Sequence, residues 1–150
     1  MRKVIAALIC AFIAVPAEAS EVECLAKNIY YEARNQDFVG MYAVAEVTIN
    51  RVNDRRWPND ICSVVKQRKV VQNQWICQFS WFCDGKSDRP KDKYYWNVSY
   101  TVAYVVMSQG WQGTVPADTY WYHSRKVQPY WADAYHRSAV IGDHIFYTDK

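Results

Sequence analysis

The feature that most constrains this chain is a set of four cysteines, Cys24, Cys62, Cys77 and Cys83, behind a segment with the pattern of an export signal. An even number of cysteines in an exported chain predicts disulfide bridges, because exported thiols meet an oxidising environment. Of the three possible pairings we favour Cys77 with Cys83 and Cys24 with Cys62. A four-cysteine zinc site is the alternative, but the Cys-x5-Cys spacing is wider than zinc ligands usually show. We therefore expect two bridges.

The export signal is predicted over residues 1–19. A basic start is followed by an apolar run over residues 4–15, which contains Cys10, and then by the small-x-small pattern that a signal peptidase recognises. The apolar run is shorter than the roughly 20 residues that span a bilayer. We expect cleavage before Ser20, an exported protein that is periplasmic or extracellular, and no permanent membrane span. Retention of the segment as a temporary membrane anchor is the alternative.

Residues 20–150 are predicted to form a single domain. Their length suits one hydrophobic core, and the hydrophobic fraction of 51% with 16% aromatic residues excludes a disordered chain. Without residues 1–19 the chain carries 16 basic and 14 acidic residues. This mild positive charge is compatible with attraction to an anionic polymer and is far below that of a nucleic-acid-binding protein. We expect a monomer that binds no nucleic acid.

Residues 21–34 have the pattern of an amphipathic helix with a carboxylate near its end. Ser20 and Glu23 fit a capping box, which predicts that the helix begins near Glu21. Glu32 lies on the flank of the apolar stripe, where burial and the helix dipole both favour its protonated form. Glu32 is therefore a candidate general acid, and a surface glutamate at a helix end is the alternative. The stripe consists of Val22, Leu25, Ala26, Ile29 and Ala33.

The remaining periodicity predicts a helix-dominant α+β domain. Asp37 and Asp92 are expected to cap two further long helices, and Gly110 is expected to end the second of them. We expect a closing hairpin strand at the end of the domain, with a kink at Gly142. Three main helices, a short fourth and a small irregular β lobe result. The expected elements are helices over residues 41–52, 60–65 and 92–109, an irregular strand or lobe over 66–75, and strands over 120–123 and 139–147.

Three polar residues are candidate substrate contacts. Glu46 lies inside the apolar run 41–52 and is expected either to contact substrate or to be a buried glutamate paired with Arg34 or Arg51. Gln78 and Ser80 lie between aromatic residues in the loop that joins the last two cysteines. An amide and a hydroxyl held beside rings suit a polysaccharide, whose sugar faces stack on aromatic side chains.

The histidines are the last candidate group. His123 is the last residue of the predicted aromatic strand 120–123 and is expected to be either a structural residue or a residue of the binding cleft. His136 and His144 could join it around a metal, but their spacing resembles no ligand motif. We therefore predict no metal and no other cofactor.

Several motifs, taken together and in order, resemble the SleB-type cell-wall hydrolases of spore cortex, bacterial envelopes and phages. The resemblance extends over nearly all of the chain after residue 22. Two departures stand out: Asn35-Gln36 replaces the usual Gly-Glu, which removes a possible second carboxylate, and the polar stretch 66–74 is longer than usual. The matching motifs are Ile29–Arg34, Ala43–Val52, Cys77–Trp81, Cys83–Gly85, Tyr122–His123 and Ile141–Tyr147.

The resemblance implies a lysozyme-like fold in which a helical part and the small β lobe flank a glycan groove. It also implies that Glu32 is the catalytic acid and base, and that Tyr31, Tyr122 and His123 contact the peptidoglycan strand. With a single well-placed carboxylate, we expect a lytic transglycosylase that cleaves the β-1,4 bond between N-acetylmuramic acid and N-acetylglucosamine. A hydrolytic muramidase using the same site, and a non-catalytic disulfide-stabilised glycan-binding module, are the alternatives.

Overall fold

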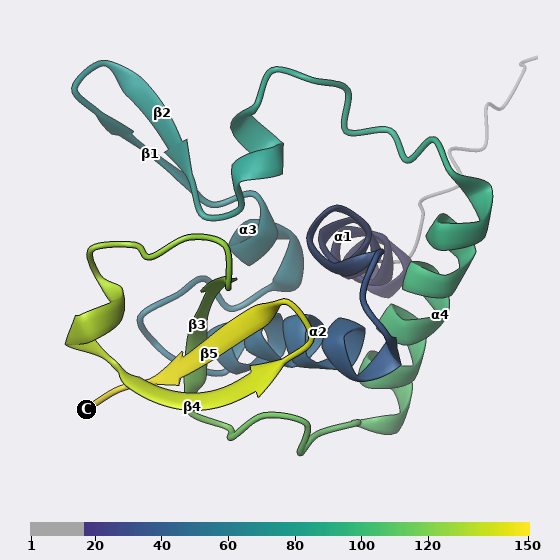
Figure 1. Cartoon of the computed structure of the whole chain (residues 1–150). Helices are drawn as coiled ribbons and strands as arrows, with labels where there is room; N and C mark the ends of the chain where they lie inside the picture. Colours follow the sequence, from purple (N-terminus) through teal and green to yellow (C-terminus); the bar gives the residue numbers. More distant parts are fainter. Residues whose placement is uncertain (1–16) are drawn as a thin grey trace, which may run out of the picture.

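The computed structural model describes residues 17–150, so the export signal predicted over residues 1–19 lies almost entirely outside the described residues. Within them the predicted helix-dominant α+β class is confirmed, with three long helices and one short one beside a small β lobe (Figure 1). No helix in this range is both long enough and apolar enough to cross a membrane. In chain order the elements are α1 (Ala17–Ala33), α2 (Phe38–Val52), α3 (Ile61–Val65), β1 (Arg68–Val71), β2 (Gln74–Cys77), the 3₁₀ turn η1 (Ser80–Cys83), α4 (Lys93–Gln109), β3 (Thr119–Ser124), the 3₁₀ turn η2 (Ala132–Ala134), β4 (His136–Ile141) and β5 (His144–Thr148).

Helix α1 packs against all three other helices (Figure 1). Its apolar stripe forms the predicted core face, because Leu25, Ile29 and Ala33 have no exposed surface. Full burial of a leucine or isoleucine side chain contributes about 1.5–3 kcal/mol. The helix already includes Ala17, the first described residue, so the prediction of a start near Glu21 is wrong, and Ser20 lies inside the helix rather than capping it.

Two contacts join the start of α1 to α3. The Glu21 carboxylate accepts hydrogen bonds from the backbone N–H groups of Ile61 and Cys62, so it serves the first turn of α3. Beside this contact lies the Cys24–Cys62 disulfide, and the second predicted bridge, between Cys77 and Cys83, is also present. On the chain-entropy model, closing a loop of the length between Cys24 and Cys62 stabilises the fold by about 4 kcal/mol. That bridge therefore anchors the helix that carries Glu32.

The other helices begin and end where their capping residues predict. Asp37 caps α2 by accepting a hydrogen bond from the Gly40 N–H at 2.8 Å, and the helix runs to Val52 as predicted. Asp92 caps α4 through the Tyr95 N–H at 3.1 Å. Helix α4 ends at Gly110, whose φ of +60° is readily adopted by glycine. Local side-chain chemistry thus sets the helix bounds.

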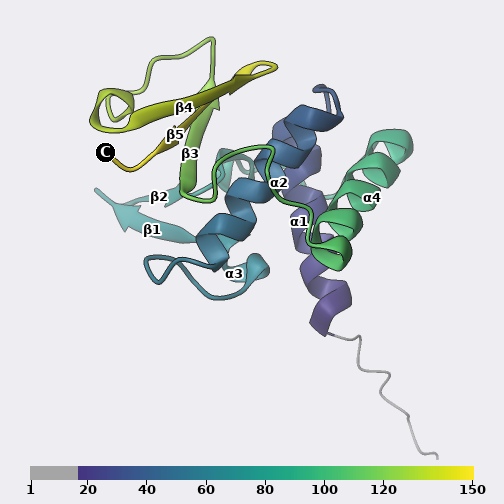
Figure 2. The same cartoon turned by 90° about the horizontal axis from the view of Figure 1, so that it is seen from below.

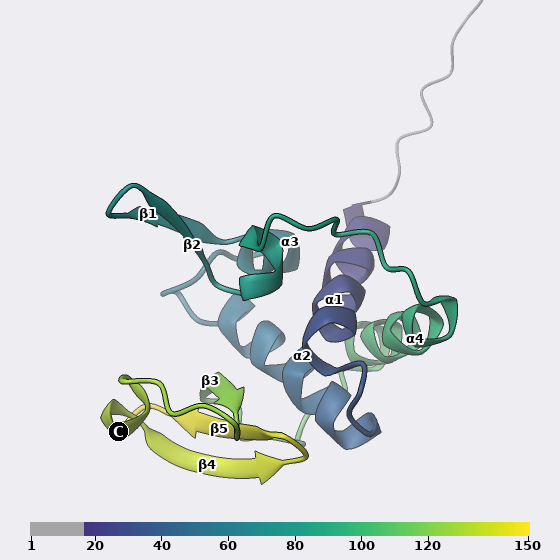
Figure 3. The same ribbon diagram turned by 45° about the horizontal axis from the view of Figure 1, so that its top comes forward.

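The polar stretch after α3 forms a two-stranded hairpin that projects from the body of the molecule (Figures 1 and 3). Strands β1 and β2 pair antiparallel. The two residues between them, Gln72 and Asn73, have φ values of +49° and +62°, as a tight two-residue hairpin turn requires. The sequence predicted an irregular strand or lobe over residues 66–75, whereas the structure has a regular two-stranded hairpin that extends to Cys77.

A three-stranded antiparallel sheet in the order β3-β5-β4 lies on one side of the helical part (Figure 2). The closing hairpin strand with a glycine kink that was predicted over residues 139–147 is instead parts of two strands, because the chain reverses between β4 and β5. Gly142 has a φ of +54° and lies in the turn that makes this reversal. The glycine therefore ends one strand and allows the next to begin.

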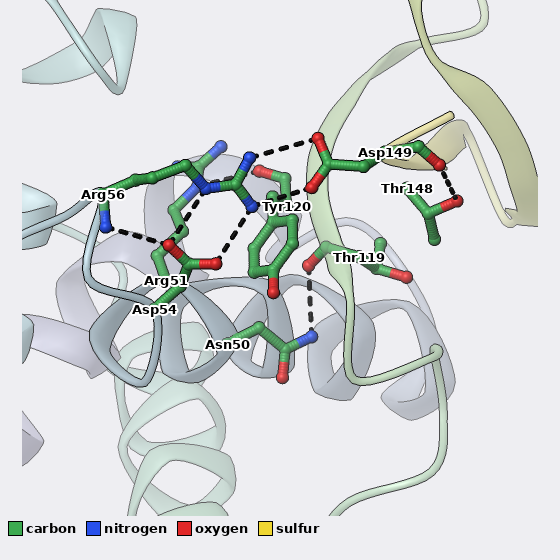
Figure 4. Close-up of polar contacts among 8 residues, drawn as sticks. All are labelled: Asn50, Arg51, Asp54, Arg56, Thr119, Tyr120, Thr148 and Asp149. Atoms are coloured by element: carbon green, nitrogen blue, oxygen red, sulfur yellow. Dashed lines mark hydrogen bonds and ion pairs between the residues drawn. The ribbon is translucent and has the colours of Figure 1, made fainter.

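The end of α2 holds the first strand of this sheet in place (Figure 4). The Asn50 side-chain amide donates to the Thr119 carbonyl at 3.1 Å, and Arg51 Nε donates to the Tyr120 carbonyl at 2.8 Å. Strand β3 is thereby fixed relative to the helices. An ion-pair network further links the loop after α2 to the C-terminal segment through Arg56, Asp54 and Asp149.

Candidate active site

Three adjoining cavities form a groove between the helical part and the β elements, in the position predicted. A central cavity of about 270 Å³ adjoins a turn-side cavity of about 350 Å³, which reaches the turn between β4 and β5. On the other side it adjoins a hairpin-side cavity of about 510 Å³, which reaches the β1–β2 hairpin. Neighbouring cavities share lining residues, so the groove is continuous. The central cavity is lined by Glu32, Arg51, Cys77, Gln78, Phe79, Ser80, Trp121, Tyr122 and Trp131.

Glu32 lies in the last turn of α1 and lines both the central and the turn-side cavity. It is half-buried, as its place on the flank of the apolar stripe predicted. Burial raises the pKa of Glu32, while the hydrogen bond from Tyr122 and the positive charge of Arg51 partly oppose the shift. A carboxyl group with a raised pKa, open to a groove, is suited to donate a proton near neutral pH.

Tyr122 of β3 places a phenol against this carboxyl group. Its hydroxyl donates a hydrogen bond to Glu32 Oε2 at 3.2 Å. Burial, and then the negative charge of Glu32, raise the pKa of Tyr122 well above its ordinary value. The phenol therefore stays protonated and remains a donor, which orients the carboxyl group in either of its protonation states.

Arg51 is a cation buried beneath the same cavity, with only 2% of its surface exposed. Burial lowers its pKa to about 10, so it stays charged at neutral pH, and Glu32 is one of the groups that favour the charge. Besides the Tyr120 carbonyl, its guanidinium bonds Gln78 when that amide is oriented to accept, with N–O distances of 3.2 and 3.3 Å. Arg51 therefore places a positive charge near Glu32 and also contacts Gln78, a residue that lines the groove.

Three of the predicted substrate contacts, Tyr31, Gln78 and Ser80, lie in the groove near Glu32, and Tyr31 packs against a second aromatic ring. The Tyr31 ring stacks on Trp81 with a centroid distance of 4.7 Å, and both line the turn-side cavity. The Trp81 indole N–H donates to the buried Asn28 side chain at 3.1 Å. Gln78 and Ser80 line the central cavity and are exposed. The structure thus brings Tyr31, Gln78 and Ser80 together with Glu32.

His123 faces the turn-side cavity, but the sheet occupies both of its ring nitrogens. Nδ1 lies 2.9 Å from the Ser124 carbonyl, to which it must donate, and Nε2 lies 2.8 Å from the Tyr147 hydroxyl, from which it accepts. No ring nitrogen is left to bond a sugar. Of the two roles expected for His123, these bonds favour the structural one.

Glu46 lies outside the groove around Glu32, contrary to its predicted contact with substrate. Its carboxylate is buried and accepts hydrogen bonds from the backbone N–H groups of Gly113, Thr114 and Val115, with shortest distances of 3.3, 3.0 and 3.0 Å. The alternative partners Arg34 and Arg51 do not take this role. Glu46 fixes the loop between α4 and β3.

Gln36, at the position where the resembling family has a second carboxylate, bonds the turn between β4 and β5. Its amide donates to Asp143 Oδ2 at 3.1 Å and accepts from the Asp143 backbone N–H at 2.9 Å. Both residues line the turn-side cavity. Asp143 is therefore the one other carboxylate among the described residues lining the central and turn-side cavities.

Three residues that line the central cavity were not predicted as groove residues: Arg51, expected only as a possible partner of Glu46, and Trp121 and Trp131. The signal for Arg51 was available, because an arginine within a helix that is apolar on most sides must be compensated by partners elsewhere. Trp131 reaches the groove from the segment before η2, which no local pattern places. Among residues 17–150, no three His, Cys, Asp or Glu side chains form a group able to hold a metal ion.

Residues 35–147 match the protein family described as Cell Wall Hydrolase, so the match begins just after Glu32. A stretch of 53 residues, 34% of this chain, is 38% identical to a spore cortex-lytic enzyme of Halalkalibacterium halodurans. That stretch covers only 16% of the relative, so the chain corresponds to a small part of its length.

Two solved structures share the fold. The catalytic domain of the Bacillus cereus SleB protein matches with a TM-score of 0.62 and 21% identity, over 87% of this chain and 91% of that one. The catalytic domain of the germination-specific lytic transglycosylase SleB from Bacillus anthracis matches with a TM-score of 0.63 and 22% identity, over 85% and 93%. At these identities the likeness establishes the fold, and the predicted lysozyme-like architecture is confirmed.

Proposed function

The chain belongs to the cell wall hydrolase family, and from that premise we propose that it is a peptidoglycan glycosidase, specifically a lytic transglycosylase with Glu32 as its general acid and base. The bond cleaved is the β-1,4 linkage between N-acetylmuramic acid and N-acetylglucosamine. One observation carries the proposal: a half-buried glutamate with a raised pKa lies in the central cavity of a continuous groove. One of the similar folds belongs to a lytic transglycosylase, which supports the same assignment.

In the first step the protonated Glu32 donates its proton to the glycosidic oxygen. The bond between that oxygen and the anomeric carbon breaks, and the electron pair leaves with the oxygen. The neighbouring N-acetyl group of the muramic residue stabilises the resulting positive centre. Two neighbours stabilise the carboxylate that Glu32 becomes: Arg51 through its positive charge, and Tyr122 through the hydrogen bond that its hydroxyl donates.

In the second step the Glu32 carboxylate takes a proton from the muramic 6-hydroxyl, whose oxygen then bonds to the anomeric carbon. The product is a 1,6-anhydro sugar, and Glu32 is again protonated. The nucleophile belongs to the substrate and is already close to the reacting carbon, so no water has to be positioned. Tyr31, Gln78 and Ser80 are proposed to hold the sugars on either side of the bond.

A hydrolytic muramidase is the second candidate, and Asp143 is the observation that favours it. Most glycosidases use two carboxyl groups, roughly 5–10 Å apart. Asp143 lies in the turn-side cavity with Glu32, and it could activate a water once released from Gln36. In the structure Asp143 Oδ2 accepts a hydrogen bond from Gln36, and the transglycosylase needs neither this second carboxylate nor a positioned water, which makes it the first candidate.

We also propose that the protein acts outside the cytoplasm as a monomer. Residues 1–19 would be the export signal, and residues 20–150 would form the single catalytic domain. Two disulfides support an oxidising location, since such bridges persist in exported proteins.

The test is Glu32→Gln, which keeps the shape of the side chain and removes the proton. We expect a folded protein that still sediments with insoluble peptidoglycan and cleaves it at least about 100-fold more slowly. The matched control is Glu23→Gln, an exposed glutamate of the same helix, which should cleave at the wild-type rate. More than about a tenth of wild-type activity in Glu32→Gln would contradict the assignment. Binding without cleavage by the wild type would favour a glycan-binding module.

A further inference from the structure

The hairpin-side cavity is the largest part of the groove, and the chemistry proposed for Glu32 does not use it. It lies between the β1–β2 hairpin and the segment over residues 125–135, which face each other at the left of Figures 1 and 3. It shares Gln78, Trp121 and Trp131 with the central cavity. A polymer lying across Glu32 would therefore continue into it.

The rings that line this cavity hold one another in place. Trp121 stacks on Tyr135 with a centroid distance of 3.8 Å, and Trp131 meets the same tyrosine edge-on at 6.0 Å. Trp57 lies edge-on to Trp121 at 5.9 Å. In front of them stands Tyr130, which is 98% exposed. Apolar rings fixed at an open cavity favour the flat apolar faces of sugars, because little conformational entropy is lost when a sugar stacks on them.

The hairpin adds positive charge to these rings. Arg68 and Lys69 of β1 line the cavity, and both are exposed. Arg68 rests on the Trp75 ring at 4.4 Å, and neither cation takes part in an ion pair among the described residues. The part of the chain that the structure describes contributes no Asp or Glu to this lining. An occupant with carboxylates would therefore meet two available cations and no opposing charge.

We infer that the hairpin-side cavity is a second substrate-binding region, which takes a carboxylate-bearing segment of the glycan strand beside the bond held at Glu32. The inference rests on the proposed glycosidase function and adds the kind of glycan that the groove selects. Peptidoglycan combines N-acetylated sugars with lactyl and peptide carboxylates, so it satisfies both the rings and the cations. A neutral polymer of N-acetylglucosamine such as chitin satisfies only the rings.

An anionic lipid surface is the other occupant that exposed cations and apolar residues of the hairpin could serve, since Val70 and Trp75 are also exposed. The cations, however, line a concave cavity continuous with the central cavity. A membrane surface would approach a protruding face instead. The glycan strand is therefore the occupant that the geometry favours.

The experiment compares a charge-removed variant, Arg68→Gln with Lys69→Gln, with a matched control, Lys93→Gln with Arg137→Gln. The control removes the same charge from exposed positions away from the groove. Both pairs are placed in the Glu32→Gln background, and binding to insoluble peptidoglycan is measured by sedimentation. We expect the charge-removed variant to bind about three- to tenfold more weakly at low salt, with a smaller difference at high salt. The control should bind as well as its parent.

Two further polymers separate the roles of the cations and the rings. Peptidoglycan whose carboxyl groups have been amidated should bind the parent and the charge-removed variant equally, and so should chitin. Tyr130→Ala, at a side chain with almost no contacts, should weaken binding to all three polymers a few-fold. With active Glu32, the charge-removed variant should show a raised KM and a kcat within about twofold of wild type.

The outcomes separate this inference from the proposed function. Equal binding of intact peptidoglycan by the charge-removed and control variants, with normal cleavage by the wild type, would overturn the inference alone. Absence of cleavage by the wild type would overturn the glycosidase function instead. Lost binding to phosphatidylglycerol vesicles with unchanged binding to peptidoglycan would also overturn the inference and assign the hairpin to membranes.

Discussion

Glu32 and Glu46 are glutamates on neighbouring helices of one core, and their surroundings differ. Glu46 lies in the middle of α2 and accepts hydrogen bonds from three consecutive backbone N–H groups of the loop before β3. Glu32 lies at the end of α1 and accepts one hydrogen bond, from the Tyr122 hydroxyl. The first carboxylate is committed to the fold, whereas the second keeps acceptor capacity toward an open groove.

The difference shows that the availability of a carboxylate, rather than its burial, identifies the candidate catalyst. Glu46 is the more buried of the two, yet its neighbours leave it no contact with the central cavity. Burial raises the pKa of Glu32, while the Tyr122 phenol and the Arg51 cation limit the rise. Substitutions at the two positions should therefore separate stability from activity.

Glu46→Gln is expected to reduce stability more than Glu32→Gln or Tyr122→Phe. The glutamine side chain would point its NH₂ group at a backbone N–H. At least one of the backbone N–H groups of residues 113–115 would then have no acceptor. We expect the free energy of unfolding to fall by about 3 kcal/mol, measured by urea denaturation. Activity per folded molecule should stay near wild type. A stable Glu46→Gln protein without activity would reverse the roles assigned to the two residues.

Tyr122→Phe is expected to have an intermediate effect, because it removes the hydrogen bond to Glu32 and keeps the ring. The lost bond favoured the charged carboxylate, so the pKa of Glu32 should rise further. We expect kcat/KM to fall about fivefold, with the alkaline limb of its pH profile moved to higher pH. The pH profile of peptidoglycan cleavage checks both. An alkaline limb that stays in place would mean that the limb does not report Glu32.

The smallest effect is a pH-dependent gain in stability for Glu32→Gln. Because the pKa of Glu32 is raised by folding, the stability tied to its proton is full below the unfolded pKa and is lost as pH rises through the folded pKa. Glutamine has no such proton to lose. Urea denaturation at acidic and neutral pH should therefore show Glu32→Gln gaining stability relative to wild type as pH rises. A constant difference between the two proteins would contradict the raised pKa.

Short-range patterns allowed much of the fold to be predicted from the sequence. The caps Asp37, Asp60 and Asp92 act on N–H groups within three residues of themselves, so their helices could be placed from local spacing. The position of Glu32 on the flank of a stripe follows from the same helical period. The even count of cysteines, together with the export pattern, led to the two bridges that the structure contains.

The errors concern side chains whose partners are distant in sequence. Glu46 bonds residues about 67 positions away, and Arg51 bonds a carbonyl 69 positions away. No local pattern chooses among such partners, so both a pairing with an arginine and a contact with substrate stayed open for this buried glutamate. Glu21 likewise bonds two backbone N–H groups of α3 that lie about 40 positions away, a contact that no local pattern predicts.

The central claim is that a single carboxylate performs the reaction, and the masses of the released fragments test it most directly. Purified protein without residues 1–19 is incubated with peptidoglycan, and the soluble products are analysed by mass spectrometry. With the muramic 6-hydroxyl as the nucleophile, fragments should end in 1,6-anhydro sugars, lighter by one water, about 18 Da, than hydrolytic fragments. Fragments with reducing muramic ends would contradict the claim and would require a second group, for which Asp143 is the structural candidate.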